Sequence, residues 1–204
     1  QFSAIVCAEV LIPVHHNVLS RAEADGITRV YSRPEIFDQC RKWLSDHLQS
    51  AERMPVSSSA KAAQIARDEP GAAAVGSTLA GDIYGLPAVF TNIEDNRNNI
   101  TRFFVIGRRR PKRSGYDKTA IMFTTAHKPG ALADVLDVFR QHKVNLTHID
   151  KRPSQRVNWE YYFFIDCEGH TEDENVTAAI DAAREHCLHL TILGSFPRAK
   201  TVLE

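Results

Sequence analysis

The hydrophobic and polar positions after residue 118 follow two alternating periods. Apolar residues recur at helical spacing in 130–142 and again in 173–187, whereas 159–168 alternates as a half-buried strand does. The pattern predicts strand, helix, strand, strand, helix and strand over Thr119–Thr125, Gly130–His142, Val144–Lys151, Trp159–Glu168, Asp173–Cys187 and Leu188–Ser195. This order is the ferredoxin-like βαββαβ arrangement.

Residues 1–107 alternate short apolar strands with helical patterns, which predicts an α/β layer arrangement. The expected strands are Ala4–Val14, Thr28–Tyr31, Met54–Ser57, Gly71–Gly76 and Ile100–Gly107. One helix follows Pro34 and shows a single apolar face from Ile36 to Leu48. Two more helices follow Ser58 and Ser77, and both serines suit the N-cap position.

The composition excludes several classes of protein. The 204 residues are 43% hydrophobic and carry a net charge of zero, so nothing indicates a nucleic-acid or membrane-surface partner. No apolar run approaches the roughly 20 residues of a membrane span. The basic run Arg108–Arg113 is either a targeting or nucleic-acid patch or a solvated linker; the Pro, Ser and Gly around it favour a linker over 108–117, between domains 1–107 and 118–204.

Cysteine and histidine spacing argues against disulfides and metals. The four cysteines form no CxxC pair, which fits a reducing, cytoplasmic compartment. The nine histidines form neither HxxxH nor HExxH, so we expect no metal site.

Several runs in the C-terminal half resemble the regulatory ACT domain of prephenate dehydratases. They are Lys128-Pro-Gly-Ala-Leu132, Val144-Asn-Leu-Thr147, Asp150-Lys-Arg-Pro153, Glu160-Tyr-Tyr-Phe-Phe164, Glu168-Gly-His170 and Leu193-Gly-Ser-Phe-Pro197. The regulatory domain of aromatic amino-acid hydroxylases shares some of these runs. The preceding half of the chain therefore has to decide between the two families.

That half resembles the prephenate dehydratase catalytic region. The matching runs are Ile12-Pro-Val-His-His16, Val30-Tyr-Ser-Arg-Pro34, Gln39-Cys40, Ser58-Ser-Ala60, Ala73-Ala-Val-Gly-Ser77, Tyr84-Gly-Leu86 and Asn99-Ile-Thr-Arg-Phe103. Hydroxylases are excluded, because they need iron-binding residues downstream of the sensor. By resemblance the catalytic domain has two lobes like a periplasmic binding protein. Its Gly/Ser-rich opening and Pro-Ile-Glu-Asn-Ser run are missing, and the start at Gln1 looks like a chain entered partway through, so we expect only the second lobe, one return strand and the sensor.

The resemblance implies conversion of prephenate to phenylpyruvate, water and carbon dioxide, without a cofactor. Aromatisation drives this reaction, and the protein has to bind a dianion and polarise the departing hydroxyl. Thr101 is implied in that role, although a β-branched residue is also ordinary in a strand. Arg102 either pairs with a substrate carboxylate or lies on an exposed strand face. Phe103 is expected to pack and position the strand.

Substrate-binding residues are implied at Ser58, Ser59 and Asn99. The two serines precede a helix, whose N-terminus favours an anion, although Ser58 also caps it. The family usually has Thr at position 59 and His at position 33, where this chain has Arg33. For His16 we favour a structural role over a catalytic one.

The resemblance further implies that L-phenylalanine binds the sensor between two subunits of a homodimer or larger homo-oligomer and inhibits the enzyme. Gly130, Ala131 and Leu132 would offer N–H donors and apolar contact at a helix start. Asn145 and Asp150 would take the ammonium group, within the run that ends in Arg152 and Pro153. Leu132 also fits the apolar core stripe, and Gly130 a plain helix start. Asp150-Lys151 replaces the usual Glu-Ser, so affinity or effector choice is expected to differ.

Two hypotheses from different classes follow. In the first, the chain is part of a prephenate dehydratase, and the resemblance extends to bifunctional enzymes in which a chorismate mutase is fused to it. In the second, it is a catalytically incomplete fragment that acts only as an amino-acid-binding regulatory module.

Overall fold

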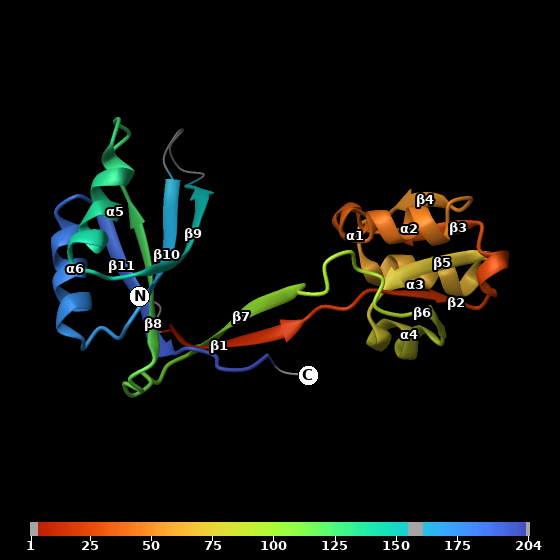
Figure 1. Ribbon diagram of the computed structural model, residues 1–204, viewed down its shortest axis with the longest axis horizontal. Helices are drawn as coiled ribbons and strands as arrows, with labels where there is room; N and C mark the ends of the chain where they lie inside the picture. The colour runs from red at the N-terminus through yellow and green to blue at the C-terminus, as the bar shows by residue number, and fades with distance from the viewer. Residues whose placement is uncertain (1–3, 155–160, 203–204) are drawn as a thin grey trace. The chain divides into compact units, whose positions relative to one another are not determined.

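A computed structural model describes residues 4–154 and 161–202 (Figure 1). The chain divides into two compact units. Among the described residues, the ferredoxin-like unit comprises 4–11 and those from Arg102 to residue 202, and the inserted unit comprises Ile12–Thr101.

The inserted unit is built on a five-stranded sheet in the order β4-β3-β5-β2-β6. Its strands are β2 (Asn17–Ser20), β3 (Arg29–Ser32), β4 (Glu52–Pro55), β5 (Ala72–Gly76) and β6 (Ala88–Phe90). β3 is parallel to β4 and β5, and β2 is antiparallel to β5 and β6. The helices are a 3-10 turn (Ala24–Gly26), α1 (Pro34–Gln39), α2 (Arg41–His47), α3 (Ser59–Asp68) and α4 (Thr78–Tyr84).

Alternate residues of this sheet enter two separate cores. Val18 of β2 and Val75 of β5 pack with Leu44 of α2 and with Cys40, which lies between α1 and α2. Leu19, next in sequence to Val18, packs instead with the alanines of α3. Helices therefore cover both faces, and the sheet is buried on both sides.

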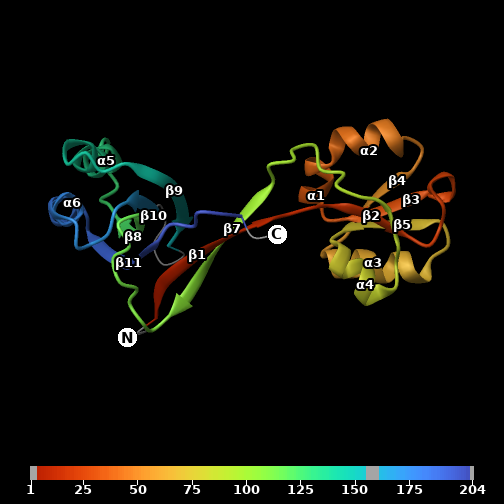
Figure 2. The same ribbon diagram turned by 60° about the horizontal axis from the view of Figure 1, so that its bottom comes forward.

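The ferredoxin-like unit has a four-stranded antiparallel sheet in the order β11-β8-β10-β9. Its elements are β8 (Asp117–Thr124), α5 (Ala131–Gln141), β9 (Leu146–Pro153), β10 (Tyr161–Glu168), α6 (Glu174–Arg184) and β11 (His189–Pro197). Both helices lie on one face of the sheet, as Figure 2 shows. They bury Val135, Phe139 and Ile180 against Phe123 and Ile165.

Two further strands, β1 (Ile5–Pro13) and β7 (Ile100–Gly107), pair with each other as a two-stranded sheet. Val6 of β1 packs on Ala120 of β8 and Phe196 of β11. This packing explains why the compact units differ from the predicted boundary at 107–118: β1 and most of β7 belong with the ferredoxin-like unit.

Most predicted elements are confirmed to within a few residues, and the helix Thr78–Tyr84 and the strand Ile100–Gly107 match fully. The single helix expected from Ile36 to Leu48 is wrong, because Cys40 leaves helical geometry (φ −115°, ψ 18°) and separates α1 from α2. The strands β2 and β6 are additional. Part of the strand expected from Trp159 lies outside the described residues.

All four cysteines are free thiols. Burial, with the nearby charges of Asp95 and Glu94, raises the pKa of Cys40 to about 12, and burial raises that of Cys167 to about 12. Among the residues that the structure describes, no helix is both long and apolar enough to cross a membrane.

Candidate functional site

The topology of the inserted unit brings several polar side chains to one sheet edge. The carboxyl ends of β3, β4 and β5 meet there, and each is followed by a helix that begins beside Arg33, Ser59 or Ser77. Because β2 is antiparallel to β5, the residues that precede it, His15 and His16, reach the same edge. These residues, with Val14 and Gln39, line a pocket of about 350 Å³. Carboxyl ends of strands are the usual ligand sites of open α/β sheets.

His16 is buried, and both its ring Nε2 and its backbone N–H have hydrogen-bond partners. Its Nε2 lies 2.7 Å from Gln39 Oε1, and its backbone N–H donates to Glu94 Oε2 at 2.9 Å. This agrees with the structural role favoured for His16. His15 is half-exposed beside it, with Nδ1 2.7 Å from Glu94 Oε1.

Glu94 anchors both histidines to the loop that leads toward β7. Burial alone would raise the pKa of this carboxyl, but hydrogen bonds from the His16 N–H and the His15 ring outweigh burial and hold the pKa below its usual range. Glu94 is therefore a carboxylate. Next to it, Asp95 accepts from the N–H groups of Lys42 and Trp43 and caps α2.

Ser58 caps α3, as predicted: its Oγ accepts from Lys61 N at 3.1 Å. Ser59, one position on, lines the pocket. The structure thus brings Ser59 to the side chains at the strand ends, whereas the hydroxyl oxygen of Ser58 is engaged in capping.

Asn99 ties the start of β7 to the pocket wall. Its side-chain Nδ2 donates to the backbone carbonyl of Val14 at 3.2 Å, and its own backbone carbonyl accepts from the Val14 N–H at 2.8 Å. The amide that the resemblance assigns to substrate therefore already holds Val14. Thr101 follows two residues later, and it is exposed.

Arg102 lies in a buried cluster of four charges within the ferredoxin-like unit. Its guanidinium is ion-paired with Asp166 of β10 and lies 3.5 Å from Glu9 of β1. Glu9 also binds Lys118 Nζ at 3.1 Å and accepts from Ala199 N at 2.9 Å. The expectation of an exposed strand face for Arg102 is wrong, since the side chain is only 22% exposed. Its substrate contact stays a prediction.

Phe103 does not pack as expected; it is 50% exposed. The reason is the strand's alternation, since the neighbouring Phe104 reaches Phe196, with ring centroids 5.7 Å apart. Arg102 stacks on the same ring, with its guanidinium carbon Cζ 4.6 Å from the centroid of Phe104.

The predicted effector residues lie at two ends of the ferredoxin-like unit. Gly130 precedes α5 in the left-handed region (φ 82°), Ala131 is buried, and Leu132 packs on the core. Asn145 follows α5, whose 11 residues span roughly 16 Å. One chain alone therefore does not bring Asn145 next to Gly130.

Asp150, Arg152 and Pro153 lie on β9, the strand at the sheet edge. The Asp150 carboxylate accepts from the Lys151 N–H at 2.8 Å and is paired with Arg152 at 3.1 Å. An incoming ammonium group would therefore share Asp150 with Arg152.

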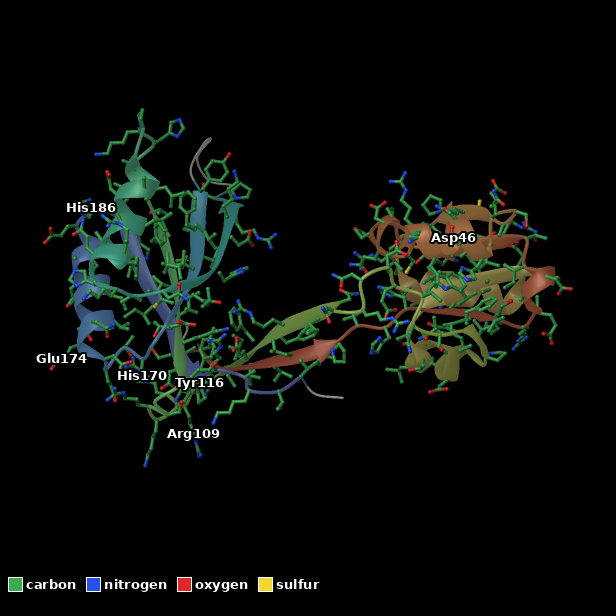
Figure 3. All side chains as sticks on the ribbon, in the orientation of Figure 1. Asp46, Arg109, Tyr116, His170, Glu174 and His186 are labelled. Carbon is green, nitrogen blue, oxygen red and sulfur yellow. The ribbon has the colours of Figure 1, made fainter. Side chains whose placement is uncertain are left out.

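Metal-binding geometry is not seen in the described part of the chain, where no three His, Cys, Asp or Glu side chains are grouped suitably. Figure 3 shows the described side chains; Glu174 begins α6, and His186 follows its other end.

Glu94 was not singled out from the sequence, Gln39 was quoted only as part of a motif, and Ser77 was identified only as a helix cap and not as a site residue. His16 is hydrogen-bonded to Gln39, 23 residues away, and to Glu94, 78 residues away, so no local spacing could reveal either pair.

Two family models match the chain. A model for prephenate dehydratase covers residues 1–111, and a model for the ACT domain covers residues 119–185. A bifunctional chorismate mutase/prephenate dehydratase from Aquifex aeolicus is 41% identical over 195 residues, which is 95% of this chain and 54% of the relative. The chain spans about half the length of the curated relatives it matches first.

Solved structures agree with these matches. Prephenate dehydratase from Arthrobacter aurescens, solved in complex with L-Phe, has a TM-score of 0.85 and 32% identity, covering 99% of this chain and 69% of that one. GqqA, described as a novel type of quorum quenching acylase, has a TM-score of 0.83 and 25% identity, covering 97% and 73%. The fold thus has a known counterpart, and the chain belongs to the prephenate dehydratase family and carries an ACT domain.

Proposed function

We propose that this chain forms the second catalytic lobe and the regulatory domain of a cytoplasmic prephenate dehydratase of phenylalanine biosynthesis. The observation that carries the proposal is the pair of hydrogen bonds between Asn99 and Val14. They tie the segment that leads into Thr101 to the wall of the pocket at the strand ends.

In this reaction the ring carboxylate leaves as carbon dioxide, and its bonding electrons enter the ring as the C–O bond to the hydroxyl breaks. The hydroxide takes up a proton and leaves as water. Thr101 would donate a hydrogen bond to the departing oxygen, and Ser59 with the α3 N–H groups would hold a substrate carboxylate. No step needs a cofactor. On the same strand, Arg102 would contact a substrate carboxylate and Phe103 would help to position the strand.

Changing Thr101 to alanine should lower kcat by about 100-fold or more with little change in KM, since the contact forms in the transition state. Thr101→Ser retains the hydroxyl and should keep most of the activity. Phenylpyruvate formation is measured with a version of the protein extended to the length of its relatives. Equal and small effects of the two substitutions would refute the role of Thr101.

The same assay distinguishes the enzyme from the alternative function, a regulatory module without turnover. Phenylpyruvate formation by the extended protein supports the enzyme. Binding of L-phenylalanine without turnover in that protein would favour the module.

For the effector, we propose L-phenylalanine bound between the ACT domains of a homodimer or larger homo-oligomer, with feedback inhibition of the enzyme. Gly130 to Leu132 of one subunit and Asn145 of its partner would complete the site, which accounts for their separation along α5.

Calorimetry on the 204-residue chain should show L-phenylalanine binding, weakened about tenfold or more by Asp150→Asn, because a charged hydrogen bond to the ammonium is lost. Asp137→Asn is the matched control, since Asp137 is an exposed carboxylate on α5 that pairs with Arg140. An equal loss with both substitutions would argue against Asp150 as an effector ligand.

A further inference from the structure

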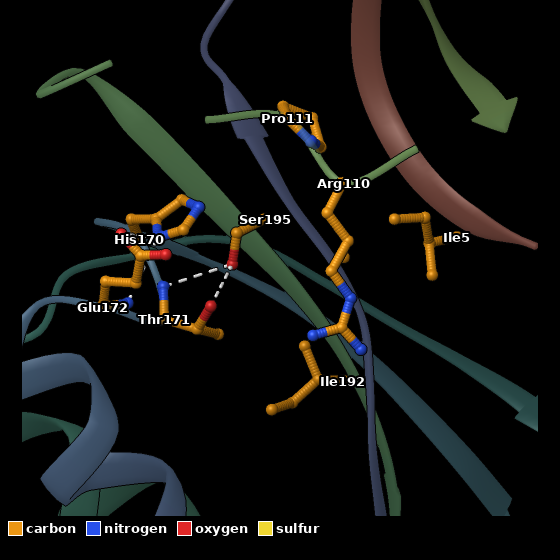
Figure 4. A pocket seen from close by; sticks show the side chains of 9 residues that line it. Ile5, Arg110, Pro111, His170, Thr171, Glu172, Ile192 and Ser195 are labelled. Atoms are coloured by element: carbon orange, nitrogen blue, oxygen red, sulfur yellow. Dashed lines mark hydrogen bonds and ion pairs between the residues drawn. The ribbon is translucent and has the colours of Figure 1, made fainter. Parts of the chain in front are cut away.

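A second pocket lies wholly within the ferredoxin-like unit and contains none of the predicted effector residues. It has a volume of about 270 Å³. Its walls come from the start of β1, the segment 110–111, the loop 170–172 and the middle of β11, as Figure 4 shows.

The pocket is a consequence of backbone geometry. The pairing of β11 with β8 is irregular between Ile192 and Gly194, so the strand bulges there. At Gly194 the backbone of Val6 comes so close that a Cβ would lie 2.0 Å from Val6 O. β1 therefore sits tightly on β11 at Gly194, and the pocket opens between that contact and the loop.

One wall is a fixed array of hydroxyl groups. Ser195 Oγ is 2.8 Å from Thr119 Oγ1 and 3.1 Å from Thr171 Oγ1, and it accepts from Thr171 N at 3.2 Å. Thr119 in turn donates to Gly169 O at 2.8 Å, so the single Ser195 proton can serve only one of the two hydroxyl contacts. The hydroxyl groups therefore satisfy one another and form a fixed polar surface.

The same wall carries a buried imidazole. His170 is 5% exposed, and its Nδ1 accepts from Glu172 N at 3.1 Å. A neutral ring therefore has its proton on Nε2. Within residues 4–154 and 161–202, no hydrogen bond of this Nε2 is found, and since it is not one of the buried atoms without a partner, the nitrogen is open to solvent. It is a donor next to Ser195 and Thr171 (Figure 4).

A cation and three apolar side chains complete the pocket. Arg110 reaches from its segment toward Ile192, between Ile5 and Ser195 (Figure 4). It is exposed, and it forms no ion pair with any other described residue. Ile5, Pro111 and Ile192 supply the apolar surface.

The charges nearby favour an anion. Arg110 lies in the basic run Arg108–Arg113, while Asp173, beside the loop, is already ion-paired with Arg113. Glu172 is the one carboxylate among the described lining residues, and its side chain is 71% exposed, where water screens it.

We propose that this pocket binds a small organic monocarboxylate with an apolar body. The carboxylate pairs with the Arg110 guanidinium and accepts from His170 Nε2, while the apolar body lies on Ile5, Pro111 and Ile192. Such a site in the regulatory unit would let a second small acid act on the protein independently of phenylalanine.

The test is calorimetry of the 204-residue chain with 3-phenylpropanoate as the probe, with 3-phenylpropanamide and inorganic phosphate as comparisons. Arg110→Gln should weaken 3-phenylpropanoate binding about tenfold or more, because a charge-assisted pair is lost. Arg109→Gln is the matched control: the same charge is removed one residue away, from a side chain that does not line the pocket (Figure 3). His170→Leu removes the imidazole donor and should also weaken 3-phenylpropanoate binding.

Binding of 3-phenylpropanoate that depends on Arg110 and not on Arg109, with weaker binding of the amide and of phosphate, supports the site. Equal losses in both arginine variants, equal binding of the amide, or no binding of 3-phenylpropanoate would overturn it. Phosphate binding as tight as that of the organic acid would contradict the apolar subsite. Phenylalanine binding should be unchanged in Arg110→Gln, which separates this proposal from the effector site.

Discussion

Replacing Arg102 by methionine is expected to destabilise the ferredoxin-like unit by about 3–5 kcal/mol, because it leaves a buried carboxylate without its counter-ion. The Asp166 side chain is 4% exposed and its carboxylate is ion-paired with Arg102. Glu9 keeps Lys118 and the Ala199 N–H, so the damage falls mainly on Asp166. Urea unfolding followed by circular dichroism measures the change.

Two further variants make this test specific. Arg102→Met combined with Asp166→Asn should recover much of the loss, because the uncompensated charge is removed with its partner. Arg140→Met, which breaks an exposed pair with Asp137, should change stability little. A double variant no more stable than Arg102→Met alone would contradict the ion-pair explanation.

This result bears on the catalytic assignment. Since Arg102 holds two acidic groups in place, a loss of activity in an Arg102 variant does not by itself identify a substrate contact. Only a variant that stays folded and changes kcat or KM would do so.

Gly194→Ala is expected to be the most damaging single methyl group in the chain. The added Cβ would lie 2.0 Å from Val6 O and 2.9 Å from Val6 C, and a strand backbone cannot move aside as a flexible side chain can. β1 should detach from β11, with the loss of the Val6, Ala120 and Phe196 packing and a cost above the usual 1–3 kcal/mol of overpacking.

The measurement is thermal unfolding, with hydrogen exchange at the β1 amides. Gly26→Ala is the control, because its Cβ would meet only Ala22 Cβ at 3.6 Å. Near-normal stability of Gly194→Ala with protected β1 amides would show that β1 does not need this close approach.

Local signals in the sequence predicted the elements whose pattern is self-contained. The stripe that includes Val135 and Phe139 predicted α5, and Ser58 and Ser77 marked two helix starts because capping involves only the next few residues. β2 escaped prediction since all four of its residues are buried and show no alternation. The partners that satisfy its polar ends, Gly76 O for Asn17 and Ala72 O for Ser20, lie 59 and 52 residues away.

The candidate site divides in the same way. Ser59 could be placed from the helix it begins, but the partners of Arg102 are 93 and 64 residues distant in Glu9 and Asp166. For Arg102 the sequence left a substrate contact and an exposed strand face open, and it did not reveal the buried carboxylates that the side chain meets. The residue types could be identified from the sequence, but contacts between residues far apart along the chain could not be predicted.

The insertion of Ile12–Thr101 between β1 and β7 also has a consequence for biosynthesis. The inserted unit is continuous, so it can complete its fold while the ribosome is still making the rest of the chain. β1 is translated before the inserted unit but packs against Ala120 and Phe196, which are translated after it. β1 therefore cannot complete its packing until Phe196 has been made, and the ferredoxin-like unit is the later of the two to complete its fold.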